Sequence, residues 1–205
     1  MKIKKNNVGL KETDDSLFGA THIRRWSYAT SKALDEFLSL AYYQEKNLPV
    51  VIVRFFNTVG PRQLGEYGMV IPRFVQQAIK NEPITVYGSG NQTRSFCDVS
   101  DVCDAIWQLH KNDDCSGQIF NIGGKEEISM NDLAKKVKKL SSSNARIVKI
   151  PYSEAYGPGF EDMNRRFPST EKINSYTGWV QTRSLDEILI RTIDFEKKRL
   201  GNGLK

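Results

Sequence analysis

The sequence predicts an α/β protein, and three observations support this class. Short β-branched runs alternate with segments whose apolar residues recur at helical spacing, as in proteins that alternate strands with helices. One run, Val50–Phe56, is almost continuously apolar, which is typical of a parallel strand covered on both faces. The chain has 205 residues, of which 39% are hydrophobic and 26% charged, an ordinary globular composition that allows one core and part of another.

The first third of the chain predicts a loop, a long helix and a strand. Residues 1–22 are polar and aperiodic, which indicates a loop or a frayed terminus. From Ser27 to about Lys46 an i, i+3, i+4, i+7 stripe predicts an amphipathic helix; its apolar members are Ala33, Leu34, Phe37, Leu38 and Ala41. Pro49 ends this helix, the buried parallel strand follows, and Gly60-Pro61 begins a loop.

The rest of the chain continues the alternation. Helices are expected over residues 70–80 and 101–110 and from Ser129 onward, and strands over 84–87, 118–122 and 146–150. Ser184-Leu-Asp-Glu187 is a capping box that opens a final helix, with Ile188, Leu189, Ile193 and Phe195 on one face. A long loop from Gly157 to Pro168 precedes it, and loops of that length are often functional.

A net charge of +6 raises the question of nucleic-acid binding. The densest basic cluster lies within Asp132–Leu140, where Leu133, Val137 and Leu140 recur at helical spacing. Its lysines therefore form the solvated face of an ordinary amphipathic helix. We expect no nucleic-acid partner, and a modest positive field equally suits a polyanionic small ligand such as a sugar diphosphate.

The composition also predicts a cytoplasmic protein without a membrane or metal partner. No apolar run approaches the roughly eighteen residues of a membrane span, and no apolar segment follows the charged first residues as a secretory signal would require. Cys97, Cys103 and Cys115 form no C-x-x-C pair, which predicts buried reduced thiols. His22 and His110 lack the spacing of a metal site or a nucleophilic triad.

The motif Tyr28-Ala-Thr-Ser-Lys32 could carry proton-transfer chemistry. A spacing of four places both side chains on one helix face, one turn apart. A free tyrosine has a pKa near 10 and is a poor base at neutral pH, but a neighbouring ammonium favours the phenolate. The pair could therefore exchange a proton with a sugar hydroxyl.

A second copy of this spacing, Tyr42-Tyr-Gln-Glu-Lys46, follows on the same predicted helix. In a chain with eight tyrosines and many lysines, about one such match is expected by chance. The spacing alone does not decide between Tyr28–Lys32 and Tyr42–Lys46.

Five motifs occur in a fixed order: WSYATSKALDEF over 26–37, VRFFNTVGPR over 53–62, ITVYGSGNQTRSF over 84–96, FNIGG over 120–124, and RRFPSTEK over 165–172 with Gly178-Trp179. From about Lys11 to Arg199 the chain resembles the nucleotide-sugar epimerases, dehydratases and decarboxylases of the extended short-chain dehydrogenase/reductase superfamily. The resemblance implies the C-terminal part of a Rossmann-type doubly wound parallel sheet plus a smaller mixed α/β substrate-binding domain. Residues 1–66 would belong to the dinucleotide-binding domain and 67–205 mainly to the substrate domain, with about 94–125 returning to the Rossmann part.

The resemblance also implies roles for individual residues. Tyr28 is similar to the catalytic acid/base, Lys32 to its partner that also holds the nicotinamide ribose of NAD, and Phe56 to the aromatic residue beside the nicotinamide. The substrate, a UDP-sugar or another nucleoside-diphosphate sugar, would meet Asn57, Val70, Ile71, Tyr87, Gly88, Gln92, Arg94 and Arg166 (or Arg165). A homodimer is implied for the full-length form, with Leu38, Tyr42 and Tyr43 facing either the partner or the intramolecular core.

The sequence departs from the family pattern in its first part. It has no glycine-rich turn between a strand and a helix to hold the NAD pyrophosphate, and no segment with the family's catalytic Ser/Thr upstream of Tyr28. An incomplete gene, a mis-called start, and a split or degenerate protein remain open as explanations. We expect the 205-residue polypeptide alone to show no turnover.

The reaction type remains open at this point. The run Gln92–Cys97 resembles UDP-glucuronate decarboxylases, whereas Ala29 and Met69 stand where those enzymes carry other residues. We therefore favour a UDP-sugar 4-epimerase-like or dehydratase-type enzyme working through a 4-keto sugar, with a decarboxylase as the alternative. A non-catalytic nucleotide-sugar-binding or dimerising fragment is the alternative from a different class.

Overall fold

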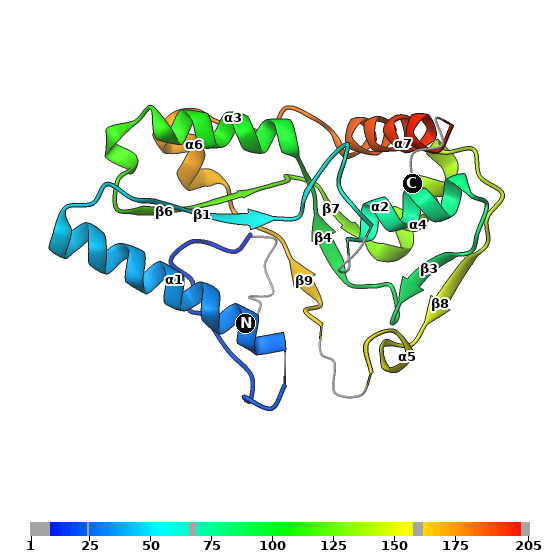
Figure 1. Ribbon diagram of the computed structural model, residues 1–205, viewed down its shortest axis with the longest axis horizontal. Helices are drawn as coiled ribbons and strands as arrows, with labels where there is room; N and C mark the ends of the chain where they lie inside the picture. The colour runs from blue at the N-terminus through cyan, green and yellow to red at the C-terminus, as the bar shows by residue number, and fades with distance from the viewer. Residues whose placement is uncertain (1–8, 24, 66–68, 158–161, 202–205) are drawn as a thin grey trace.

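The computed structural model describes residues 9–23, 25–65, 69–157 and 162–201. Figure 1 shows two groups of elements, with three short strands, β4, β7 and β9, between them. Each group has its own cluster of buried apolar side chains. The predicted α/β class is confirmed, since strands and helices alternate and four pairs of strands run parallel.

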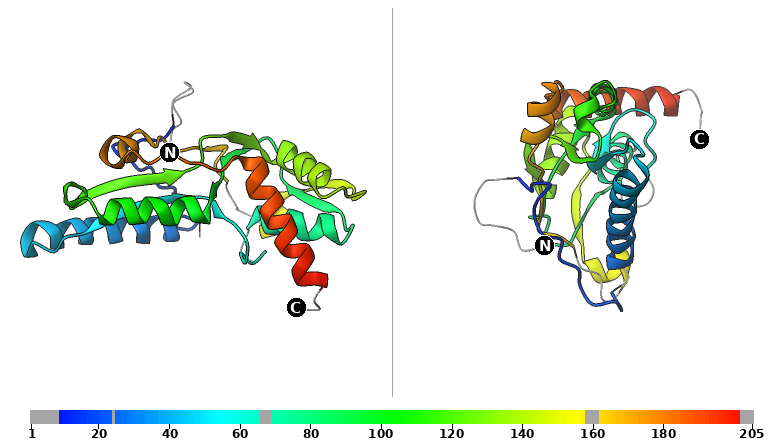
Figure 2. Two further views of the ribbon diagram at one scale, coloured as in Figure 1. Left: turned by 90° about the horizontal axis from the view of Figure 1, so that it is seen from above. Right: turned by 90° about the vertical axis from the view of Figure 1, so that its left-hand side faces the viewer.

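The first group is built on a parallel pair of strands, β1 (Val51–Phe56) and β6 (Gln118–Gly123). Val51 and Val53 pack with Phe120 and Ile122 against helices α3 (Val99–His110) and α6 (Glu171–Thr177). The opposite face carries α1 (Arg25–Lys46), as Figure 2 shows from above. Arg54 of β1 fixes α1 there with two hydrogen bonds of 2.7 Å to the Glu36 carboxylate, which raise the Arg54 pKa.

The second group surrounds another parallel pair, β3 (Ile84–Tyr87) and β8 (Ile147–Ile150). Three helices enclose its core: α2 (Val70–Ile79), α4 (Met130–Leu140) and α7 (Leu185–Gly201). The lysine-rich helix α4 buries Leu133 and Val137 as its periodicity predicts. The capping box of α7 is confirmed, because the Ser184 N–H donates to Glu187 Oε2 at 2.7 Å.

Short strands and two buried carboxylates join the groups. The strand β2 (Thr58–Val59) pairs in parallel with β5 (Cys97–Asp98), and β4 (Thr93–Ser95) pairs with β7 (Glu127–Ser129) and β9 (Arg165–Arg166). Asp98 caps α3 through the Ser100 N–H and pairs with Arg191 of α7 at 2.9 Å. Asp101 accepts hydrogen bonds from Thr182 and Arg183. Both carboxylates therefore act in structure, as their position at a helix start predicts.

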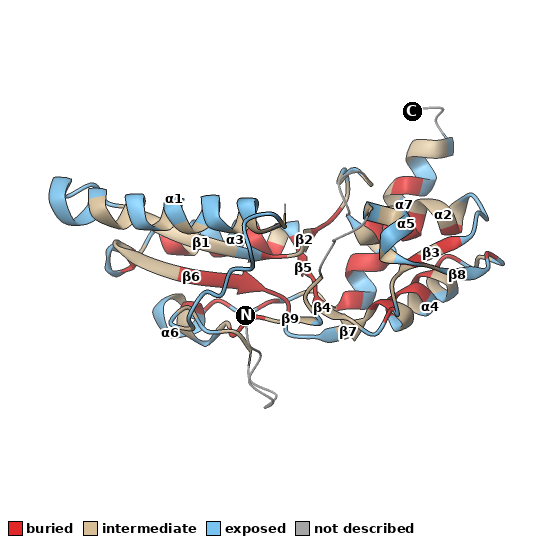
Figure 3. Ribbon diagram, turned by 90° about the horizontal axis from the view of Figure 1, so that it is seen from below, coloured by how far each residue is buried: buried red, intermediate tan, exposed pale blue. Residues whose placement is uncertain are grey.

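The apolar stripe of α1 does not belong to a core, because Leu34, Phe37 and Leu38 are more than half exposed, and residues 26–46 are all intermediate or exposed in Figure 3. Three expectations need correction. The strand β1 is only partly buried. Cys103 is exposed, whereas Cys97 and Cys115 are buried. The long loop holds β9, and the short helices α5 (Tyr152–Tyr156) and α6 lacked a periodic signal.

Among the described residues, no helix is long and apolar enough to cross a membrane. The exposed α1 stripe and the partial burial of β1 have one reason. Periodicity shows which side of an element is apolar, but not whether another element is present to cover that side.

Candidate functional site

The pair Tyr28–Lys32 lies on the first turns of α1, at the carboxyl end of the parallel strands. Only residues 47–50 separate α1 from β1, so the two run antiparallel and the start of α1 lies toward the tip of β1 (Figure 1). Ligands of open α/β sheets bind at this carboxyl edge. The second copy, Tyr42–Lys46, lies at the opposite, amino end of β1. The geometry therefore favours Tyr28–Lys32.

Both side chains of this pair are accessible. Tyr28 is 70% exposed, and the Lys32 ammonium lies 5.9 Å from the centre of the Tyr28 ring. Lys32 Nζ donates to Asp35 Oδ2 at 2.8 Å, and this hydrogen bond raises the pKa of Lys32. Lysine is charged at neutral pH at its ordinary pKa, so the ammonium lies beside Tyr28 as a positive neighbour.

Three predicted residues meet at the tip of β1. Phe56 is buried, and the Arg166 guanidinium lies over its ring, 5.4 Å from the ring centre. Arg166 also donates to the Phe55 carbonyl at 3.2 Å. Asn57, the next residue, adopts φ of +49° and donates from Nδ2 to the Ser95 carbonyl at 2.7 Å. Asparagine tolerates this left-handed backbone better than most residues, which explains its place directly after the strand.

Arg94 has a role that the sequence did not predict. Its Nη2 donates to both Asp162 oxygens at 2.8 and 2.9 Å, and its Nη1 donates to the carbonyls of Thr93 and Met163. The Arg94 and Asp162 side chains are only 12% and 20% exposed. The Arg94 guanidinium, which was expected to bind a substrate phosphate, instead connects β4 to the segment before β9 in this structure.

The two neighbouring arginines of β9 contact different parts of the structure. Arg165 Nε and Nη2 bind the Glu127 carboxylate at 2.8–3.0 Å, whereas Arg166 points to Phe56 at the tip of β1. Successive side chains of a strand point to opposite faces. Arg165 therefore pairs with a residue of the β7–β4–β9 sheet, whereas Arg166 points toward the carboxyl edge of β1. Of the two arginines proposed to meet the substrate, the geometry favours Arg166.

The Arg165 guanidinium lowers the pKa of Glu127, which makes acid stability testable. A lowered folded-state pKa contributes stability above the unfolded pKa near 4.5 and loses it as the pH falls through the folded value. We expect Glu127→Gln to unfold more easily at pH 7 by about 1–2 kcal/mol. The difference should shrink progressively below pH 4.5 in urea titrations at several pH values, and a constant difference would contradict this assignment.

A cluster of aromatic and charged side chains surrounds the predicted base-binding residues. The Arg73 guanidinium lies 3.7 Å from the Tyr87 ring centre, and Tyr156 meets the same ring edge-on at 5.4 Å. Gln92 Nε2 donates to the Tyr87 carbonyl at 2.9 Å. Gly88 has φ of +69°, and a Cβ there would lie 2.4 Å from the Tyr152 ring, so only glycine fits.

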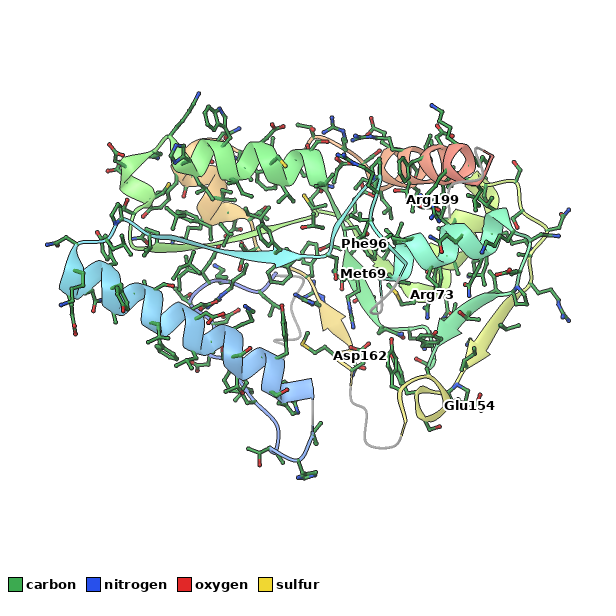
Figure 4. The ribbon with its side chains drawn as sticks, in the orientation of Figure 1. Met69, Arg73, Phe96, Glu154, Asp162 and Arg199 are labelled. Carbon is green, nitrogen blue, oxygen red and sulfur yellow. The ribbon has the colours of Figure 1, made fainter. Side chains whose placement is uncertain are left out.

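This cluster is connected to the Arg94–Asp162 ion pair. Tyr152 Oη donates to Asp162 Oδ2 at 3.1 Å, so the residues around Tyr87 and the Arg94–Asp162 pair form one network. Burial, followed by the Asp162 charge, raises the pKa of Tyr152 to about 12, and its hydroxyl stays protonated at neutral pH. Figure 4 labels Arg73 on α2 and Asp162 before β9. Sequence reasoning missed Arg73, Tyr152 and Asp162, because no local pattern links residues so far apart in the chain.

The remaining predicted residues, Val70 and Ile71, begin α2. The Ile71 side chain is buried in the second core, so a ligand could meet only its backbone, whereas Val70 is partly exposed and packs against the edge of that core. Met69 precedes them at the N-cap without a capping side chain. Among the described residues, no hydrogen bond joins Tyr28 or Lys32 to the network around Phe56 and Arg94.

Comparison with known proteins agrees with this arrangement. A model of the NAD dependent epimerase/dehydratase family matches residues 8–123. The UDP-N-acetyl-alpha-D-glucosaminuronate decarboxylase of Bacillus cytotoxicus is 38% identical over 192 residues, which cover 93% of this chain and 59% of that protein.

Two solved structures are similar in fold and sequence. Pal from Bacillus thuringiensis has a TM-score of 0.81 at 30% identity, covering 93% of this chain and 57% of its own. The UDP-glucuronic acid 4-epimerase of Bacillus cereus, solved with UDP-glucuronic acid and NAD, has a TM-score of 0.76 at 25% identity, covering 90% of this chain and 58% of its own. The chain thus spans less than two thirds of the length of these proteins.

The parallel strands and the covering helices define a Rossmann-type α/β protein with a tyrosine–lysine pair at its carboxyl edge. The chain belongs to the NAD dependent epimerase/dehydratase family. The predicted fold class and the resemblance to nucleotide-sugar epimerases, dehydratases and decarboxylases are therefore confirmed.

Proposed function

We propose that this chain is the tyrosine-bearing, nucleotide-sugar-binding part of an NAD-dependent enzyme that oxidises a UDP-sugar at C4. The observation that carries the proposal is the position of Tyr28 and Lys32, both exposed, at the carboxyl edge of the parallel strands. Phe56, Asn57 and Arg166 lie at the tip of β1, the strand that ends at that edge.

The residues at this edge fit one end of NAD. Tyr28 and Lys32 offer an exposed hydroxyl and ammonium to a ribose, and Phe56 offers an apolar neighbour to a nicotinamide ring. The 205 residues contain no glycine-rich strand-to-helix turn for the diphosphate end. When bound, NAD would supply the acceptor for the hydride that leaves sugar C4.

The chain's own residues would handle the proton and the substrate. Tyr28 Oη accepts the proton of the sugar 4-hydroxyl, and the Lys32 ammonium, 5.9 Å from the centre of the Tyr28 ring, places a positive charge beside it. Arg166 supplies a positive charge at the tip of β1, where it can pair with a substrate phosphate. Arg73, Tyr87 and Tyr156 offer flat surfaces to a base.

The substrate class that the comparisons favour is a UDP-linked uronic acid. The relative from Bacillus cytotoxicus is a decarboxylase named for such a sugar, and the Bacillus cereus epimerase was solved with UDP-glucuronic acid. Oxidation at C4 makes a uronic acid a β-keto acid, which can lose its carboxyl group as CO₂. The identity is 38% with the decarboxylase and 25% with the epimerase, which supports decarboxylation over the 4-epimerisation that the sequence analysis favoured.

We expect the chain to bind UDP with micromolar affinity, and Arg166→Ala to weaken that binding at least tenfold. The loss of one charge-assisted contact to phosphate is worth about 1.5–3 kcal/mol, which corresponds to roughly a tenfold to a hundredfold change. Isothermal titration calorimetry measures the dissociation constant of UDP for the native chain and for Arg166→Ala.

The neighbouring arginine provides a matched control. Arg165→Ala removes the same side chain one residue earlier, but its partner is Glu127, so UDP affinity should stay within about threefold while stability falls. Equal weakening by both substitutions, or no UDP binding by the intact chain, would contradict the proposed site.

Self-association is the second part of the proposal. Leu34, Phe37 and Leu38 form an exposed apolar stripe on α1, and an apolar helix face of this kind usually contacts another protein. A homodimer through this face is the arrangement that the family resemblance implies. This stripe points away from the β1–β6 face that α1 covers.

A further inference from the structure

Helix α4 of the second group (Figure 1) ends beside a cavity lined by lysines. Its volume of about 530 Å³ is in the range of small-molecule sites. The lining residues come from the last turns of α4, the turn after it and the start of β8, and none is acidic: Lys135, Lys138, Lys139, Ser142, Ser143, Asn144 and Ile147. Ile147 begins β8 and Tyr87 ends β3, so the cavity and the residues predicted to hold the base lie at opposite ends of this parallel pair.

The positive charge of this cavity is not compensated within the described part of the chain. Lys135 pairs with Asp132 at 2.9 Å, but both side chains are more than half exposed, so the pair is weak. Lys138 and Lys139 make no ion pair among the described residues. Lys149 is exposed and follows Ile147 on the same face of β8, which adds a further charge near the cavity.

Stabilisation of the helix end does not account for these lysines. Basic side chains in the last turn often bind the carbonyls that a helix leaves unpaired. In α4 the carbonyls of Val137, Lys138 and Lys139 already accept backbone N–H groups at 3.0–3.1 Å from the three serines that follow Leu140. The Ser141 hydroxyl also donates to the Val137 carbonyl at 2.8 Å. The ammonium groups are therefore available to a ligand.

The turn after α4 has a conformation that serine adopts only at a cost. Ser142 has φ of +55°, the left-handed region in which glycine usually ends a helix. Strained positions of this kind are concentrated at binding sites. Ser142 and Asn144 are exposed, and their side chains make no hydrogen bond among the described residues. Both line the cavity, so the strained turn offers it a hydroxyl and an amide that glycine would not provide.

Ammonium, hydroxyl and amide groups together form a set of donors and positive charges that suits phosphate oxygens. A lipid surface fits less well, because α4 buries its apolar face, Leu133 and Val137, in the second core. We propose that this cavity binds a small molecule with at least two phosphate groups, at a site separate from that of the nucleotide sugar. The inference does not depend on the proposed function, since it uses none of the residues at the tip of β1.

The test uses the full 205-residue chain with inorganic pyrophosphate as the probe. Isothermal titration calorimetry at low ionic strength should show saturable one-to-one binding. Replacing Lys138 and Lys139 together by glutamine should weaken it roughly tenfold or more, because two charges are lost. Lys136→Gln is the matched control. Lys136 lies on the same helix but pairs with Asp186 of α7 and does not line the cavity, so affinity should stay within about threefold.

Ser142→Gly separates a role in binding from a role in folding. Glycine adopts the left-handed conformation without strain, so the melting temperature should not fall. Loss of the hydroxyl should nevertheless weaken pyrophosphate binding by about threefold. A variant that lowers the melting temperature and leaves the affinity unchanged would show that Ser142 has only a structural role and would contradict the site.

Two further measurements locate the bound pyrophosphate. In nuclear magnetic resonance spectra the amides of Ser142, Ser143 and Asn144 should shift during the titration, and those of Phe56 and Asn57 should not. Arg166→Ala should leave the pyrophosphate affinity unchanged, which makes this result independent of UDP binding. Absence of saturable binding, an equal loss in Lys136→Gln, or tighter binding of duplex DNA or phosphatidylserine vesicles through Lys138 and Lys139 would overturn the proposal.

Discussion

Replacing Tyr28 by phenylalanine is expected to lower the turnover of the assembled enzyme about 10²–10⁴-fold, the usual contribution of one positioned acid/base. The change removes only the hydroxyl that exchanges the substrate proton and leaves the ring, which is 70% exposed, in place. Because so little of Tyr28 is buried, folding should be unaffected. The measurement is the initial rate of CO₂ release or epimer formation from a UDP-uronic acid, with this chain co-expressed with the part of the Bacillus cytotoxicus decarboxylase that does not align with it.

The second tyrosine–lysine copy supplies the control for this prediction. Tyr42 lies on the same helix with the same spacing to a lysine and is 55% exposed, but it is near the amino end of β1. We expect Tyr42→Phe to change the rate less than about threefold. A similar loss from both variants, or a full rate with Tyr28→Phe, would show that the carboxyl-edge position does not identify the catalytic tyrosine.

Arg94→Ala is expected to lower the free energy of unfolding by about 3–5 kcal/mol, the usual cost of breaking a largely buried ion pair. The substitution leaves the Asp162 carboxylate, 20% exposed, without its guanidinium partner, and it removes two hydrogen bonds to backbone carbonyls. Since Asp162 also accepts from Tyr152, the loss should extend to the cluster around Tyr87. Urea denaturation followed by fluorescence measures the change.

A double-mutant cycle checks that the pair itself is responsible. Arg94→Ala combined with Asp162→Ala should cost less than the sum of the two single changes, because no orphaned charge remains. Arg146→Ala, which removes an exposed arginine from the start of β8, should stay within about 0.5 kcal/mol of the native chain. Additive losses in the cycle would indicate that Arg94 stabilises the fold through its carbonyl contacts alone.

The same contacts affect how binding data should be interpreted. A loss of UDP affinity in Arg94→Ala could follow from disturbance of β4 and β9 as well as from a lost phosphate contact. Arg166 is the better probe of phosphate binding, since it lies over the Phe56 ring and donates to the Phe55 carbonyl at the tip of β1.

The sequence by itself determined the elements that depend on neighbouring residues. The helices at 25–46, 70–79 and 130–140 and the strands at 51–56 and 84–87 follow from local periodicity, and the α7 cap follows from a four-residue motif. The order of five motifs determined the family, which the family match confirms. These features are encoded within a few residues of one another, so no knowledge of distant contacts is needed.

Only the tertiary structure decided the features that depend on which distant segments meet. It placed Tyr28 and not Tyr42 toward the carboxyl edge, directed Arg166 rather than Arg165 to Phe56, and paired Arg94 with Asp162. It also left the α1 stripe uncovered by the described residues. Strand order, strand direction and long-range ion pairs fix such outcomes, and one-dimensional periodicity contains no information about them.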